Sequence, residues 1–312
     1  MRPGSQLGRY SLLEKLSDGF PGDRWAARGG DDGGLYAIRS IDTARLTDPE
    51  AVQHFAGVAF WAMELRYGAL ISPRDVIASD GQLAVVEPYI EGETLRTLLR
   101  RAHRERTAIP PAAVLRIVGD LLVGLSALEQ AVQNEPEMAP FAYGGLHPDG
   151  VLIARDGYTR LLDPGVAALA SADPAWARDP VRASYQAPER FAGGGIDGRS
   201  DIFVLGILMW EMLCLQHLFS GLQSHKVAEA LWAREIPPLS THARDPVSLP
   251  RGLADVIHRC LERHPEARFA DRGELREALA RLPLQPSSPA AITELCDRIG
   301  GRQSAERRRR LR

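Results

Sequence analysis

The chain has 312 residues and a mass of 34.2 kDa, with 45% hydrophobic and 25% charged residues. This is enough for one two-lobed domain or two small ones, with the composition of an ordinary globular protein. A formal net charge of −2 argues against a general nucleic-acid or membrane-surface binder. Three cysteines without C-x-x-C spacing, and no signal-peptide core at the start, predict reduced thiols and a cytoplasmic protein.

The first part of the chain has the pattern of a small antiparallel sheet with one helix. Alternating apolar and polar side chains predict strands at residues 10–16, 24–27, 35–41, 76–79 and 82–88. Residues 49–67 change to helical spacing, with Asp48 as the N-cap and Pro49 at the first helical position. We therefore expect a meander of strands with a helix inserted after the third strand.

The second part is mostly helical. Its clearest helical runs are residues 95–106, 110–132, 202–215, 253–262 and 272–280. The apolar stretch 202–219 contains Glu211 and falls short of a clean membrane span, so it is predicted to be a helix buried on all sides. A small sheet-rich half followed by a larger helical half predicts an α+β fold with two lobes.

The end of the chain differs in composition from the rest. Residues 283–289 are rich in proline and serine and are predicted to be a linker, followed by a short helix at about 290–299. The arginine-rich residues 307–312 leave two interpretations open. An arginine cluster can bind an acidic protein surface or nucleic acid, whereas composition alone favours a solvated, disordered end.

Several short motifs follow one another along the chain. They are Tyr36-Ala37-Ile38-Arg39, Tyr89–Leu95, Tyr143-Gly144-Gly145-Leu146-His147-Pro148-Asp149-Gly150, Asp163-Pro164-Gly165, Ala187-Pro188-Glu189, Asp197–Gly206 and Pro265-Glu266-Ala267-Arg268-Phe269. In type, order and spacing they resemble the motifs of a bacterial-type Ser/Thr protein kinase, from about Gly8 to Leu282. The resemblance implies a protein-kinase-like two-lobed fold. Its N-lobe would span residues 8–89, its C-lobe residues 90–282, and residues 283–312 would follow.

The resemblance also gives the positions at which an active kinase places its catalytic groups. Gly145 stands at the position of the catalytic base, His147 at that of the catalytic-loop lysine, and Gly150 at that of the metal-binding asparagine. Glycine can neither accept a proton nor coordinate magnesium. Val58 stands where the family has the helix glutamate of the activating ion pair. None of these catalytic positions therefore carries its usual side chain.

The family's nucleotide pocket maps onto a glycine-containing loop and two charged residues. Gly19 and Gly22 belong to the loop, for which phosphate binding and an ordinary hairpin turn both stay open. Arg39 replaces the family's lysine, and Glu87 stands at the back of the adenine pocket. Because a buried carboxylate needs a partner, we expect an Arg39–Glu87 salt bridge.

Asp163, in the motif that ends at Gly165, is the one chemically competent residue left in the pocket. It can share the expected contact of Arg39, or it can bind a magnesium ion together with nucleotide. We expect no cofactor, while ATP and magnesium stay open through Asp163.

Three residues match the scaffold of the family rather than its chemistry. Glu189 and Arg268 match a buried carboxylate–arginine pair that ties together the two ends of the helical lobe. Asp201 is expected to accept backbone N–H groups of the catalytic-loop region. The sequence therefore keeps the scaffold contacts and lacks the reaction contacts.

This pattern predicts a pseudokinase, a kinase-fold protein without phosphoryl transfer. It would act as a scaffold or allosteric partner of a signalling protein or an active kinase, with no membrane role and no nucleic acid expected. One alternative is a divergent Ser/Thr kinase that uses Asp163 and Arg39, with Asp149 as an unconventional base. The other is a sensor that binds ATP without turnover.

Overall fold

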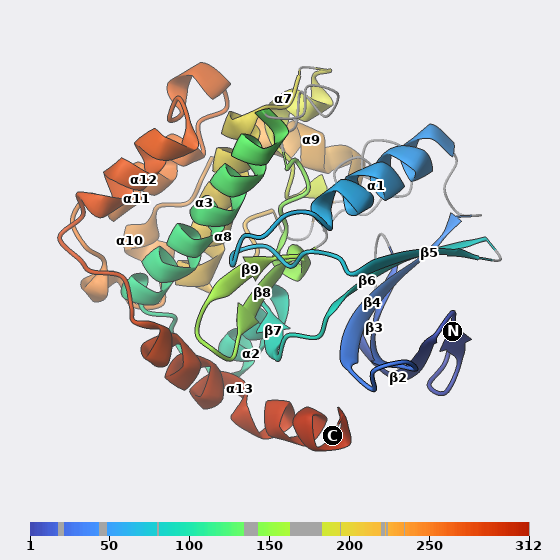
Figure 1. Ribbon diagram of the computed structural model, residues 1–312. Coiled ribbons are helices and arrows are strands. Elements are labelled where there is room, and N and C mark those ends of the chain that lie inside the picture. Colours follow the sequence, from blue (N-terminus) through green and yellow to red (C-terminus); the bar gives the residue numbers. More distant parts are fainter. Residues whose placement is uncertain are drawn as a thin grey trace.

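The protein has two lobes of unequal size (Figure 1). The computed structural model describes residues 1–17, 22–43, 49–79, 81–133, 143–162, 183–193, 195–219, 222, 224–233 and 235–311. The N-lobe holds a curved antiparallel sheet and one helix, and the C-lobe holds most of the helices. The expected two-lobed α+β architecture is confirmed.

The N-lobe sheet has the strand order β1-β2-β3-β4-β6-β5, and all neighbouring strands are antiparallel. The strands are β1 (Gln6–Leu7), β2 (Tyr10–Ser17), β3 (Asp23–Gly29), β4 (Leu35–Asp42), β5 (Asp75–Ser79) and β6 (Gln82–Pro88). One face of the sheet buries an apolar cluster that includes Trp25, Ile38 and Val86. Because side chains alternate along a strand, the neighbouring residues Arg24, Arg39 and Glu87 point to the other face.

The helix of the N-lobe, α1 (Pro49–Ala62), begins at the predicted proline, whereas the expected N-cap Asp48 lies outside the described residues. It ends earlier than the predicted position 67. Beyond Ala62 the backbone tightens, since Glu64 N donates to Trp61 O, three residues back, at 3.1 Å. Such i→i+3 bonds are typical of the last turn of a helix, after which the chain changes direction.

The C-lobe is arranged around α8. Its helices are α2 (Leu95–Glu105), α3 (Pro111–Gln133), α7 (Pro188–Phe191), α8 (Gly198–Cys214), α9 (Ser224–Ala233), α10 (Leu239–His242), α11 (Leu253–Cys260) and α12 (Arg272–Ala280), with 3-10 turns η3 (Pro148–Gly150), η4 (Pro246–Ser248) and η5 (Pro265–Ala267). Every residue of α8 from Ser200 to Cys214 is buried, as the sequence predicted for this apolar stretch. Within the described residues, only Pro111–Ala131 of α3 is long and apolar enough to cross a membrane, and 67% of its most apolar window is buried in the protein.

A second, smaller sheet lies where the two lobes meet and was not predicted. It consists of β7 (Gly92–Thr94), β8 (Val151–Ala154) and β9 (Thr159–Leu161), in that order and antiparallel. Strands of three or four residues are too short to show alternation in a sequence. The sheet joins the link between the lobes to the strand that follows the catalytic-loop segment.

The last helix, α13 (Pro289–Leu311), is longer than predicted. Its first half buries Ile292, Leu295 and Ile299 against the C-lobe. Its second half passes to the N-lobe (Figure 1), where Leu311 is 3% exposed. The expected solvated, disordered arginine tail is therefore wrong for the described residues 307–311, which belong to a helix that packs on the protein.

Candidate functional site

The catalytic-loop segment is held from both sides by the C-lobe. Gly144 has a positive φ of 57°, which favours glycine, and its N–H donates to Asp201 Oδ1 at 3.0 Å. Arg190 Nη1 donates to the carbonyl of Gly144 at 3.0 Å. Asp201 thus accepts a backbone N–H of this segment, in the way expected from the sequence.

His147 fills the space that a side chain at position 150 would need. Its Nδ1 accepts the N–H of Gly150 at 2.8 Å, so the buried imidazole caps the turn η3. An ideal Cβ at Gly150 would lie 2.8 Å from Nδ1 and 2.9 Å from Cε1 of His147. A metal-binding side chain at position 150 is therefore incompatible with this arrangement of the loop.

The carboxylate of Asp149 forms an ion pair with the helix α2. Its Oδ2 lies 2.6 Å from Arg96 Nε on α2, and the Arg96 guanidinium also lies over the Tyr185 ring, 5.7 Å from its centroid. Gly145 is buried and has no side chain to act as a base. The alternative base named from the sequence is thus ion-paired to a neighbouring helix.

The inner face of the N-lobe sheet carries a buried ion pair that the sequence did not indicate. Cross-strand register places Arg24 opposite Arg39. The side chain of Glu87 is almost fully buried, and its Oε2 lies 3.1 Å from Arg24 Nη2. Arg39 Nη1 instead donates to the carbonyl of Gly22 at 3.0 Å. The expected Arg39–Glu87 pair is corrected: among the described residues, the cation at Glu87 is Arg24.

The structure describes only some of the remaining residues that the sequence predicted for the site. Val58 is buried in α1 with 1% exposed, while the nearby carboxylate of Glu64 is exposed beyond the helix end. A Cβ at Gly22 would collide with the backbone of Ser40, so packing within the hairpin explains this glycine. The other predicted pocket residues lie outside the described part of the chain: Gly19, Asp163 and Gly165.

The scaffold pair is present as a buried, bidentate contact. Glu189 Oε1 and Oε2 accept from Arg268 Nη1 and Nη2 at 2.9 and 2.8 Å. A second buried pair joins Asp201 to Arg272 Nη2 at 2.7 Å, and Arg272 also binds Glu129 at 2.6 Å. Burial raises the pKa of Asp201 above its usual value, although Arg272 acts in the opposite direction.

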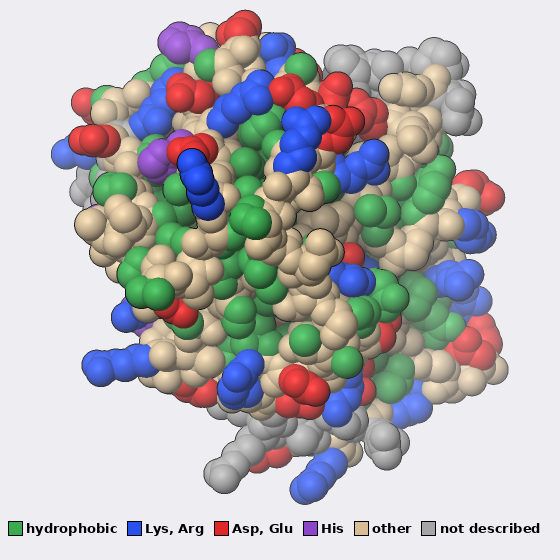
Figure 2. Space-filling view, turned by 90° about the vertical axis from the view of Figure 1, so that its left-hand side faces the viewer, with side chains coloured by type: hydrophobic (Ala, Val, Ile, Leu, Met, Phe, Trp, Pro, Cys, Tyr) green, Lys and Arg blue, Asp and Glu red, His purple; other side chains and the backbone are tan. Residues whose placement is uncertain are grey.

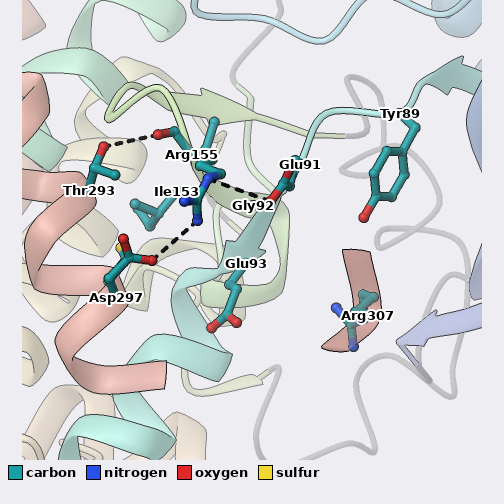
Figure 3. Close-up of a pocket in the computed structure, with 11 residues that line it drawn as sticks. Tyr89, Glu91, Gly92, Glu93, Ile153, Arg155, Thr293, Asp297 and Arg307 are labelled. Atoms are coloured by element: carbon teal, nitrogen blue, oxygen red, sulfur yellow. Dashed lines mark hydrogen bonds and ion pairs between the residues drawn. The ribbon is translucent and has the colours of Figure 1, made fainter. Parts of the chain in front are cut away.

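A pocket lies beside the link between the lobes (Figure 3). Arg155, which directly follows β8, crosses it, with Nη1 3.2 Å from Asp297 and Nε 3.7 Å from Glu91. Thr293 Oγ1 donates to the carbonyl of Arg155 at 2.9 Å. Arg307, also from α13, lies below Tyr89. A wall of this pocket is therefore made by the helix that the sequence had not placed there.

The described residues do not fit a magnesium–nucleotide site of the kinase type. Position 150, where the family has its metal-binding asparagine, offers no side-chain ligand atom, and the space beside it is filled by His147. The described part of the chain contains no group of three or more His, Cys, Asp or Glu residues that could hold a metal ion. We therefore derive no phosphoryl-transfer step for this protein.

Sequence reasoning did not find the contacts of four arginines around the site: Arg24, Arg96, Arg272 and Arg307. Arg24 lies opposite Arg39 only through the register of β3 against β4, which no local pattern gives. Arg272 begins the predicted helix at 272–280, but only the tertiary fold brings it to Asp201. The other two act through helix packing that no local pattern reveals.

The two lobes, the altered catalytic loop and the scaffold pairs define a protein-kinase-like domain. The family model described as protein kinase domain matches residues 10–280, so the chain belongs to the protein kinase family. The serine/threonine-protein kinase PknA of Mycobacterium tuberculosis is 26% identical over 97% of this chain and 72% of its own length. The tyrosine-protein kinase MasK of Myxococcus xanthus is also 26% identical, over 87% of this chain, which spans 42% of MasK.

Solved structures show the same fold. The crystal structure of the Mycobacterium tuberculosis PknI kinase domain matches with a TM-score of 0.66 at 22% identity. The match covers 90% of this chain and 98% of that domain. These relatives support a bacterial-type kinase family and a two-lobed kinase fold for this chain.

Proposed function

We propose that this member of the protein kinase family is a pseudokinase that works through protein contacts. One observation carries the proposal: the imidazole of His147 occupies the space beside Gly150 where a metal-binding side chain would begin. The base position, Gly145, also has no proton acceptor. Loss of a general base alone lowers a rate by about 10²–10⁴-fold, and the missing metal ligand adds to this loss.

The polar groups around the cleft support the same proposal. Glu87 and Arg24 bring a buried ion pair to the inner face of the N-lobe, at the back of the family's adenine pocket, where an apolar base would meet charged groups. Asp149 is paired with Arg96 and so is not available as a base. Each charged group named here already has a protein partner.

The proposed partner is another protein, either an active kinase or a different signalling protein. The buried pairs Glu189–Arg268 and Asp201–Arg272 hold the C-lobe in a defined shape, which is what a protein-binding scaffold needs. On the face of the C-lobe in Figure 2, basic and acidic side chains are interspersed. Such a surface suits a protein partner better than a polyanion.

Phosphate transfer from γ-labelled ATP, to the chain itself and to a general acceptor protein, tests catalytic silence. We expect incorporation on the order of 10³-fold or more below that of an active family member. Gly145→Asp with Gly150→Asn is expected to remain silent, because His147 blocks the new amide. Transfer by the natural sequence that disappears in Asp163→Ala would overturn the proposal.

A thermal-shift titration and a complementation experiment separate a scaffold from a sensor. We expect no change in Tm with ATP and magnesium, whereas a magnesium-dependent increase would favour an ATP-binding sensor. A strain lacking the gene should be complemented by Asp163→Ala as well as by the natural chain. Failure of that variant to complement, at normal protein levels, would contradict the scaffold role.

A further inference from the structure

The helix α13 consists of two segments that are held by different forces. The anchor segment, residues 289–299, buries Ile292, Leu295 and Ile299 at 1, 2 and 0% exposed. The strap segment, residues 301–311, follows a break at Gly300, whose φ and ψ are −158° and 15°. The anchor is part of the C-lobe core, whereas the strap leaves that lobe.

The junction of the two segments is fixed at the link between the lobes. Arg101 of α2 is ion-paired with Glu93 of β7 and donates from Nη1 to the carbonyl of Gly300 at 3.4 Å. A Cβ at position 300 would meet the side chain of this arginine, so glycine lets the guanidinium approach the backbone closely. The strap thus starts beside the strand that follows the link.

The strap then binds the N-lobe, mainly through charge. Arg310 Nε and Nη2 lie 3.0 and 2.9 Å from the two carboxylate oxygens of Glu14 on β2. Arg307 Nε lies 3.5 Å from the same carboxylate. Arg28 of β3 donates from Nη2 to the carbonyl of Leu311 at 3.1 Å. Hydrogen bonds from Arg310 help hold the pKa of Glu14 below its usual range.

The strap lies across the opening between the lobes. Arg307 lines a cavity together with Leu16 and Ser17 at the end of β2, Ile90 of the link, and Leu152 of β8. In Figure 3 it lies directly below Tyr89. A molecule that entered the cleft between β2 and the link would have to pass this arginine.

We propose that the strap segment is a releasable gate that closes the cleft mouth and ties the N-lobe to the C-lobe. Three buried apolar side chains hold the anchor, whereas the strap is held by one buried apolar side chain, Leu311, and by partly exposed ion pairs. Each of these ion pairs contributes less than a buried side chain and weakens with salt. The strap therefore detaches more easily than the anchor, by local opening. This gate does not depend on whether the protein is a pseudokinase or an enzyme.

Hydrogen–deuterium exchange of the full chain tests the gate. In Glu14→Arg and in Arg310→Glu we expect amides of residues 301–311 and 89–93 to exchange about two- to five-fold faster, the effect of one weak ion pair. Residues 289–299 should keep their slow exchange. The matched control is Arg281→Glu, because the exposed Arg281–Glu277 pair lies within one segment of the C-lobe.

The double variant Glu14→Arg with Arg310→Glu supplies the decisive comparison. If the two residues contact each other, exchange in the double variant will be accelerated by a smaller factor than the product of the two single-variant factors. In 1 M salt the natural chain should approach the single variants. Unchanged exchange in the single variants, multiplicative effects in the double variant, or equal acceleration along the whole of α13 would each overturn the proposal.

Discussion

The side chain of Arg268 has no exposed surface, and all three of its nitrogen atoms are hydrogen-bonded. Two bonds go to Glu189 and the others go to backbone carbonyls. Burial alone would raise the pKa of Glu189, but the bonds from Arg268 and Ser200 outweigh it and lower the pKa. The pair is therefore charged at neutral pH, and removing one partner would leave an uncompensated charge.

We predict that Arg268→Met lowers the free energy of unfolding by about 3–5 kcal/mol, measured by urea denaturation. Adding Glu189→Met should recover part of this loss, because no buried charge then remains. Arg281→Met is the control, since that arginine is exposed, and it should change stability by about 0.5 kcal/mol or less. Equal effects of the two arginine variants would contradict a structural role for the buried pair.

At the scale of residues, the sequence shows which side chains are absent from the family's motif positions, but it does not show which contacts the neighbouring residues make instead. The glycines at positions 145 and 150 could be read directly, because their position in a motif is local information. The partner of Glu87 could not, because it depends on the register of β3 against β4, which places two arginines side by side. Motif spacing shows that a residue such as Glu87 is unusual for its position, but it does not show which side chain forms its ion pair.

The helix α8 carries a carboxylate in its buried interior. Burial raises the pKa of Glu211 to about 7, although hydrogen bonds from Tyr185 and Leu218 favour the charged form. Tyr185 Oη donates at 2.6 Å and the backbone N–H of Leu218 at 3.0 Å. His217 Nδ1 lies 3.8 Å away, and its pKa is lowered to about 4 by burial and by Arg96.

These two groups make stability depend on pH in opposite directions. The folded state favours protonated Glu211, so its contribution is full below the unfolded pKa and is lost as pH rises through about 7. The folded state favours neutral His217, so its contribution is full above the unfolded pKa and is lost as pH falls through about 4. A substitution of Glu211 alone therefore separates its contribution to the pH dependence of stability from that of His217.

We predict that Glu211→Gln gains stability relative to the natural chain as pH rises from about 5 to 8, because an amide carries no charge to bury. The change in the difference is on the order of 3 kcal/mol at most, from the pKa shift to about 7. Urea unfolding at several pH values measures it, with the exposed Glu229→Gln as the control. A flat difference across this range would contradict the raised pKa.

At the scale of elements, long periodic segments were predictable and short or tertiary ones were not. The helix α12 and the strand β6 have the predicted bounds: Asp271 caps the start of the helix, and a turn at Gly81 precedes the strand. The three strands of the second sheet were missed because they are too short. The second half of α13 was missed because its arginines are stabilised by Glu14, far away in sequence.

The two lobes are joined by the chain at Tyr89–Gly92 and a second time by α13 (Figure 1). The first link follows from the order of the motifs, and so the two-lobed fold could be predicted. The second link depends on contacts between residues nearly 300 positions apart, such as Arg310 with Glu14. Composition could only describe those arginines as charged, which is why it favoured a disordered end.

The anchor of α13 belongs to the core of the C-lobe, and this has a consequence for the whole molecule. Ile299 is fully buried in the main apolar cluster, one residue before the break at Gly300. We predict that Ile299→Ala lowers the free energy of unfolding by about 2–5 kcal/mol, the usual effect of truncating a buried isoleucine. Because the strap starts from this anchor, amide exchange should rise along all of α13, unlike in Glu14→Arg.

The matched control for this variant is Val247→Ala, since Val247 is 95% exposed, and its effect should stay within about 0.5 kcal/mol. If Ile299→Ala were no more destabilising than Val247→Ala, the anchor would not be part of the core. If it destabilised the protein but accelerated exchange only in residues 289–299, the two segments of α13 would be independent. We expect a loss of stability with faster exchange in both segments. This result would show that the strap can bind the N-lobe only while the anchor is packed in the C-lobe.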